Sequence, residues 1–154
     1  MSEPAPQLEG WLVVVDLQHV FGDEDSPWIA PRFAEVRPRI RRLVTAFGDR
    51  VVWTRFVAPA EPVGAWKEYY EQFEFALRPP DAPLYQLIED PGPHPVVDAT
   101  TFGKWGPDLA AVVGNGPITV AGSCDDDHDR ALRIMGLYAP LVEITTTDEV
   151  LAGR

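Results

Sequence analysis

Residues 11–16, with the sequence WLVVVD, form a continuous apolar run that is rich in β-branched side chains and ends on Asp16. A strand with one wet face alternates apolar and polar residues, whereas a strand that is buried on both faces is apolar throughout. The run therefore predicts a strand at the centre of a parallel sheet, covered on both faces. An antiparallel sheet would contradict this prediction.

The rest of the chain alternates between strand-like and helix-like segments. Further strands are expected at residues 51–56, 96–97, 118–121 and 141–145. Helices are expected from about residue 36 to 47 and at residues 65–77, 107–113 and 126–138, and the proline-rich residues 78–95 are expected to lack regular structure. Strands that alternate with helices are joined by parallel crossovers. We therefore predict an α/β fold of three layers, a Rossmann-like parallel sheet with helices on both faces.

Length and composition narrow the class of protein further. A chain of 154 residues is long enough for the core of one domain, so residues 1–154 are expected to form a single domain, with residues 1–10 as a flexible lead-in. One cysteine and no charged-then-apolar leader favour a cytoplasmic protein. No apolar run approaches the roughly 20 residues that a membrane span needs. With 24 acidic and 13 basic residues, the chain repels phosphate, which argues against nucleic-acid or membrane-surface partners.

Three residues with reactive or charged side chains each follow one of the predicted strands. Ligands of parallel α/β sheets bind beyond the carboxyl ends of the strands. Asp16 ends the first strand, Lys104 follows the strand at residues 96–97, and Cys124 follows the strand at residues 118–121. An acid, a cation and a thiol are thus expected at one edge of the sheet. Each also has a structural reading: Asp16 as a loop cap, Lys104 as a solvated side chain and Cys124 as a small buried hydrophobe.

Several segments, in order and over nearly the whole chain, resemble one family. They are VVVDLQHVF, VVWTRF, ATTFGKWGPDL, ITVAG, DDDHDRAL and VEITTTDEVL. The chain resembles the isochorismatase-like cysteine hydrolases, which include nicotinamidases and carbamoyl-amide hydrolases. The resemblance implies that a cysteine thiolate attacks a small amide or carbamoyl substrate, with Asp16 as general base, Lys104 as cationic support and Cys124 as the candidate thiol. It also implies a homo-oligomer.

The sequence departs from the family pattern near its candidate nucleophile. Gly122 is followed at once by Ser-Cys-Asp-Asp-Asp, which is similar to the end of the pattern, so one βα unit of about 30 residues is interpreted as absent, together with its cysteine. When the family pattern is aligned from Gly122 without gaps, His128 lies at the position of the family cysteine. When it is aligned on the segment TTFGKW, the family lysine lies nearer Ala99 than Lys104. We expect the strands at residues 118–121 and 141–145 to pair directly.

Cys124 could replace the missing thiol, but neighbouring negative charges oppose its ionisation to a thiolate. A helix start favours a thiolate, but the aspartates at residues 125–127 oppose another anion in the same turn. We therefore expect hydrolase activity to be weak or absent. The alternative is a catalytically silent relative that serves as a ligand-binding or assembly module.

The walls of the substrate pocket are predicted to be aromatic. The candidate substrate-binding residues are Phe21, Trp53, Trp66, Tyr70, Phe102 and Trp105. Trp66 and Tyr70, in the second helix region, could instead pack into the core.

No metal and no other cofactor is expected. Asp125, Asp127 and His128 could ligate a cation, but acids in the first turn of a helix more often complement its dipole. The paired Asp-x-His metal motif of nicotinamidases is not seen after the second strand, where this chain has Trp-Thr-Arg-Phe.

Overall fold

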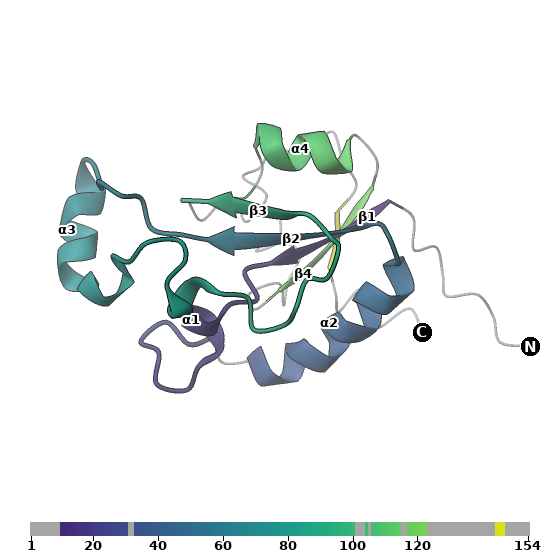
Figure 1. Cartoon of the computed structure of the whole chain (residues 1–154), viewed down its shortest axis with the longest axis horizontal. Helices are drawn as coiled ribbons and strands as arrows, with labels where there is room; N and C mark the ends of the chain where they lie inside the picture. Colours follow the sequence, from purple (N-terminus) through teal and green to yellow (C-terminus); the bar gives the residue numbers. More distant parts are fainter. Residues whose placement is uncertain are drawn as a thin grey trace, which may run out of the picture.

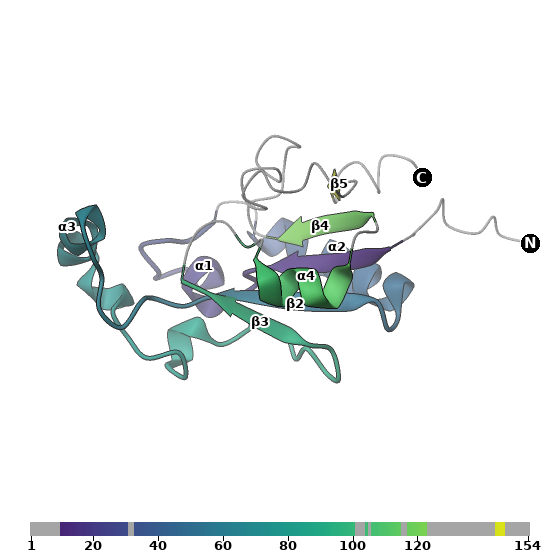
Figure 2. The same cartoon turned by 90° about the horizontal axis from the view of Figure 1, so that it is seen from above.

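The computed structural model describes residues 10–30, 33–100, 104, 106–114, 117–122 and 144–146. Within these residues, five parallel strands form one sheet in the order β3-β2-β1-β4-β5 (Figure 2). In that order the strands are Val96–Ala99, Val51–Phe56, Trp11–Val15, Ile118–Gly122 and Ile144–Thr146. The apolar run therefore forms the central strand, as predicted.

Both faces of β1 are covered because its side chains alternate between two buried clusters. Leu12 and Val14 pack with α2 (Phe33–Phe47) on one face of the sheet. Val13 and Val15 pack with α4 (Pro107–Val113) on the other. Figure 1 shows α4 above the sheet and α2 below it. The three-layer α/β fold is confirmed.

Helix α2 follows the predicted apolar spacing but begins earlier than expected. Val36, Ile40, Leu43 and Phe47 are buried along one face, at the spacing of an amphipathic helix. Pro38 lies more than one turn inside the helix rather than in its first turn. A proline there removes one backbone hydrogen bond, and the buried apolar face outweighs that cost. The helix ends at Phe47, where Gly48 takes a positive φ of 61°.

The segment after β2 is less regular than the single helix predicted at residues 65–77. Helix α3 (Ala65–Gln72) ends early, because Phe73 leaves the helical conformation with φ −122° and ψ 51°. Two short 3₁₀ turns follow, η1 (Glu74–Ala76) and η2 (Pro83–Tyr85). The short helix α1 (His19–Gly22), which follows β1, was not predicted. In Figure 1, α3 lies beyond the carboxyl ends of β2 and β3.

Strands β4 and β5 pair directly and in parallel, as the missing-unit interpretation predicted. The register joins Ile118 to Ile144 and Val120 to Thr146. The helix predicted at residues 126–138 lies outside the described residues. None of the helices in the described part of the chain combines the length and the apolar character needed to cross a bilayer.

Candidate active site

Asp16 directly follows β1 and has an unusual backbone conformation. Its φ is +54°, a left-handed value that costs a residue with a β-carbon about 1–2 kcal/mol. The backbone N–H of Asp16 donates to the Thr54 carbonyl oxygen at 3.1 Å and lies 3.3 Å from Thr54 Oγ1. The Thr54 hydroxyl in turn donates to Asp16 Oδ1 at 2.9 Å. Strand β2 thus holds both the main chain and the side chain of Asp16.

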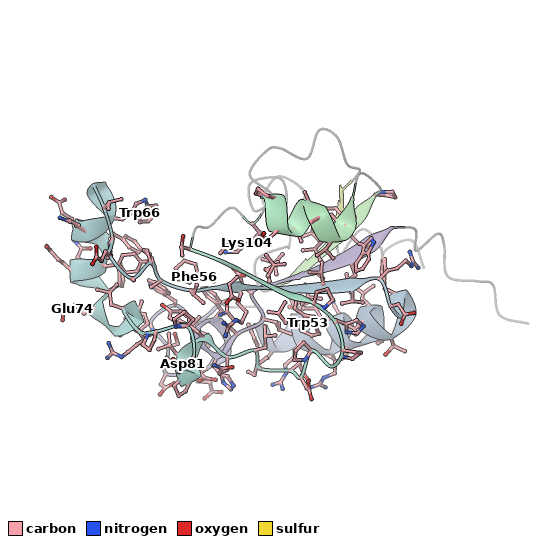
Figure 3. The ribbon with its side chains drawn as sticks, turned by 45° about the horizontal axis from the view of Figure 1, so that its top comes forward. Trp53, Phe56, Trp66, Glu74, Asp81 and Lys104 are labelled. Atoms are coloured by element: carbon pink, nitrogen blue, oxygen red, sulfur yellow. The ribbon has the colours of Figure 1, made fainter. Side chains whose placement is uncertain are left out.

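Lys104 reaches the other oxygen of the same carboxylate. Its Nζ lies 3.1 Å from Asp16 Oδ2, and the two side chains are only 1% and 13% exposed, respectively. The Nζ atom also lies 5.2 Å from the centre of the Phe56 ring, a distance at which a cation is attracted to an aromatic face. Figure 3 shows Lys104 close to Phe56, at the carboxyl end of β2. The structure therefore brings Asp16 and Lys104 together at the edge that the sequence predicted.

The charge state of Asp16 reflects two opposing effects. Burial raises the pKa of Asp16 above its usual value of 3.8, while the charge and hydrogen bond of Lys104 and the hydroxyl of Thr54 lower it. Burial and a nearby cation act in opposite directions on the pKa of a carboxyl group. Burial is the larger effect, so the pKa is raised although Lys104 is close. A carboxylate with a raised pKa is a stronger proton acceptor.

Gln18 is a structural part of the site that the sequence analysis did not single out. It is fully buried, and its Nε2 donates to the carbonyl oxygens of Phe56 and Tyr85, each at 2.8 Å. Its Oε1 accepts from the Phe56 backbone N–H at 2.8 Å. The side chain therefore ties the segment after Asp16 to the end of β2 and to η2. The signal in the sequence was an amide two residues after the acid.

Trp28 is the second feature that was missed, and it is the centre of an aromatic cluster. Five rings lie within 6.4 Å of it, centre to centre: Phe21, Phe56, Tyr69, Phe73 and Phe75. Since Phe56 also contacts Lys104, the cluster borders the ion pair. We call these six rings the aromatic wall.

The predicted aromatic pocket residues occupy different environments. Phe21 belongs to the aromatic wall and is half-buried. Trp53 and Tyr70 are buried in two separate core clusters. Trp66 is 54% exposed on α3, far from Lys104 in Figure 3. Phe102 and Trp105, also predicted for the pocket, lie outside the described residues.

The candidate thiol also lies outside the described residues, as do Asp125, Asp127 and His128. Gly122, the last residue of β4, is in register with Val15, which precedes Asp16. Within the described part of the chain, no three His, Cys, Asp or Glu side chains gather in a way that could hold a metal ion.

The fold and the sequence together identify the family. The model of the isochorismatase domain matches residues 10–124, about three quarters of the chain, so the protein belongs to the isochorismatase family. None of the curated protein sequences is significantly similar to it.

Solved structures share this fold at low sequence identity. A cysteine hydrolase from Pseudomonas syringae pv. phaseolicola 1448A is 18% identical, with a TM-score of 0.67 over 98% of this chain and 94% of that chain. The pyrazinamidase of Pyrococcus horikoshii, solved in complex with zinc, is 16% identical, with a TM-score of 0.55 over 88% of this chain and 98% of that chain. An isochorismatase-like hydrolase from Alkaliphilus metalliredigens is 10% identical, with a TM-score of 0.54 over 93% and 98%. At these identities the likeness shows an isochorismatase-family hydrolase fold.

Proposed function

We propose that the protein is a slow cysteine hydrolase that cleaves the C–N bond of a small amide or carbamoyl compound. Asp16 is the general base, Lys104 the cationic support and Cys124 the nucleophile. No cofactor takes part. Homo-oligomeric assembly and a cytoplasmic location stay predictions from the sequence.

The buried ion pair between Asp16 and Lys104 is the observation that carries the proposal. Burying two charges is costly, and a structural core is often as stable with apolar residues in their place. Here the pair lies at the carboxyl end of the central strand, where parallel α/β sheets bind their ligands. A costly pair at a ligand-binding edge is typical of a reaction centre.

Chain connectivity supports the choice of nucleophile. Cys124 follows Gly122 by two residues, and two peptide units span at most about 7 Å. Gly122 is in register with Val15, the neighbour of Asp16. This short covalent link supports Cys124 as the proposed nucleophile.

The proposed reaction has two steps. Asp16 takes the thiol proton of Cys124, the sulfur bonds to the substrate carbonyl carbon, and the C–N bond breaks as the amine leaves with the proton from Asp16. Water then gives a proton to Asp16 and its oxygen to the thioester carbon, and the departing sulfur regains that proton. Lys104 stabilises negative charge on the carboxylate and on the developing oxyanion. The aspartates at residues 125–127 oppose the thiolate, which makes the first step slow.

The test combines hydrolysis with thiol labelling. The purified chain is incubated with small primary amides and N-carbamoyl amino acids, and ammonia release is measured for the wild type, Cys124→Ala and Asp16→Asn. Both variants should lose the activity. Because the chain has one cysteine, the mass shift after one equivalent of iodoacetamide reports Cys124 alone, and labelling should disappear at mildly acidic pH.

The aspartates at residues 125–127 favour one alternative, a silent family member that binds a ligand or mediates assembly. In that case Cys124 stays unlabelled in the folded protein and no compound is hydrolysed. Hydrolysis that survives Cys124→Ala would contradict the assignment of the nucleophile.

A further inference from the structure

The hydroxyl group of Thr54 makes hydrogen bonds with both the side chain and the backbone of Asp16. Thr54 Oγ1 donates to Asp16 Oδ1 at 2.9 Å and lies 3.3 Å from the backbone N–H of Asp16, for which it is an acceptor. A hydroxyl has one proton to donate. Thr54 is only 1% exposed, so water does not compete for that proton. The direction of the hydroxyl is therefore fixed by Asp16 alone.

This contact makes the two oxygens of the Asp16 carboxylate different. Oδ1 accepts from the hydroxyl of the buried Thr54 on β2. Oδ2 faces Lys104, with Nζ at 3.1 Å. Lys104 is the charged group that acts on Asp16 among the described residues. The oxygen that does not accept from Thr54 is thus Oδ2.

We propose that Thr54 is a positioning residue that holds Asp16 in its left-handed conformation and leaves Oδ2 as the oxygen that accepts the proton. This role rests on the proposed function of Asp16 as general base. Thr54 itself touches no reacting atom. It acts by restricting the carboxylate to the orientation in which Oδ2 is presented.

A second consequence is independent of catalysis. A hydrogen bond to the ionised form of a carboxylate favours that form, so the Thr54 hydroxyl works against the effect of burial on the pKa of Asp16. Removing the hydroxyl should raise that pKa further. The contact can therefore be tested in the protein with no substrate present.

The test compares Thr54→Val, which removes the hydroxyl but keeps the branched shape, with Thr54→Ser, which keeps the hydroxyl. Thr119→Val is the matched control, because Thr119 is also a buried threonine of a central strand and is in register with Leu12 rather than with the site. The Asp16 carboxyl carbon is titrated by NMR in each protein and identified by its absence in Asp16→Asn. The pH profile of kcat and KM is measured alongside.

Thr54→Val should raise the pKa of Asp16 and lower kcat by about 10- to 100-fold with little change in KM. The acidic limb of the rate profile should move to higher pH by the same shift. Thr54→Ser and Thr119→Val should behave like the wild type. If Thr54→Val does not fold, Thr54→Ala removes the same hydroxyl and takes its place.

An unchanged pKa of Asp16 in the variant without the hydroxyl would overturn the inference, and so would a Ser variant that behaves like the Val variant. If the wild type hydrolyses nothing, the proposed function fails, and the titration alone then decides whether Thr54 positions Asp16.

Discussion

Lys104 Nζ and Asp16 Oδ2 form an ion pair that is almost entirely removed from water. Each charge is tolerated in the interior because the other is present, and the Thr54 hydroxyl and the Phe56 ring also contact the pair. Removing one partner takes away the opposite charge that lies beside the other buried group. The stability of the fold is therefore coupled to the candidate site.

The first prediction is a non-additive double-mutant cycle. Asp16→Asn and Lys104→Met should each lower the free energy of unfolding by about 3–5 kcal/mol, because each removes the opposite charge beside a buried charge. The double variant should lose clearly less than the sum, because both charges are gone. Urea unfolding at pH 7 measures all four proteins, with Lys67→Met on the exposed face of α3 as the control. Additive losses would show that the two charges do not interact.

The same pair gives Lys104→Met a distinct pH dependence. Lys104 lowers the pKa of Asp16, so without this cation the pKa in the folded protein should rise further, because burial is no longer opposed by the charge of Lys104. A carboxyl group with a raised folded-state pKa favours folding below its unfolded pKa, and this contribution is lost as the pH rises through the folded pKa. The cost of Lys104→Met should therefore be smaller in urea unfolding at pH 4 than at pH 8. A cost that is independent of pH would mean that Asp16 does not become protonated.

The sequence predicted the sheet well because its strands carry a strong signal. The uninterrupted apolar run of β1 is required by burial on both faces, and β2 was predicted with the bounds that the structure has. The end of α3 was missed because Phe73 leaves the helix to join the aromatic wall around Trp28, a contact between distant segments. Helical spacing carries no information about such contacts.

The location of the site at the carboxyl edge of the sheet was predictable from the sequence, but the contacts between its residues were not. Strand ends placed Asp16 and Lys104 at the same edge, yet the family register pointed to Ala99 for the lysine. Ala99 ends β3, and the ion pair with Asp16 is made by Lys104. Gln18 was missed because its partners, Phe56 and Tyr85, are brought to it only by the folded chain.

The next prediction concerns Gly122, where β4 approaches β1 closely. A β-carbon at Gly122 would lie 2.4 Å from the carbonyl oxygen of Val15, a backbone atom that cannot move without shifting the central strand. Gly122→Ala should therefore lower the free energy of unfolding by about 1–3 kcal/mol or more. Gly106→Ala is the control, because among the described residues no atom beyond its chain neighbours lies within 4 Å of a β-carbon there, and its φ of −173° suits any residue. Equal stability of the two variants would contradict the close approach.

A further prediction tests the buried amide of Gln18. Gln18→Met keeps the length of the side chain but removes the partner of the Phe56 backbone N–H and carbonyl oxygen, whereas the Tyr85 carbonyl still accepts from Arg55 at 3.2 Å. An unpaired buried polar group costs about 1–3 kcal/mol, so we expect a loss of about 2–4 kcal/mol in urea unfolding. Gln86→Met is the matched control, because Gln86 is exposed and its amide donates to the Asp81 carbonyl. A small loss in Gln18→Met would show that water replaces the amide.

The last prediction concerns acid sensitivity and Glu89, which joins the segment before β3 to α2. Glu89 Oε1 accepts from Arg37 Nε at 2.6 Å and from Arg41 NH2 at 2.7 Å. Burial works against the ionised form, but the hydrogen bonds and charges of the two arginines outweigh it, so the pKa of Glu89 lies below its usual 4.5. A carboxyl group with a lowered folded-state pKa stabilises the fold above its unfolded pKa, and this contribution is lost as the pH falls through the folded pKa. Glu89→Gln should therefore cost about 1–2 kcal/mol in urea unfolding at pH 7 and progressively less toward pH 3. A cost of Glu89→Gln that stays constant between pH 7 and pH 3 would mean that the arginines do not favour the ionised carboxylate.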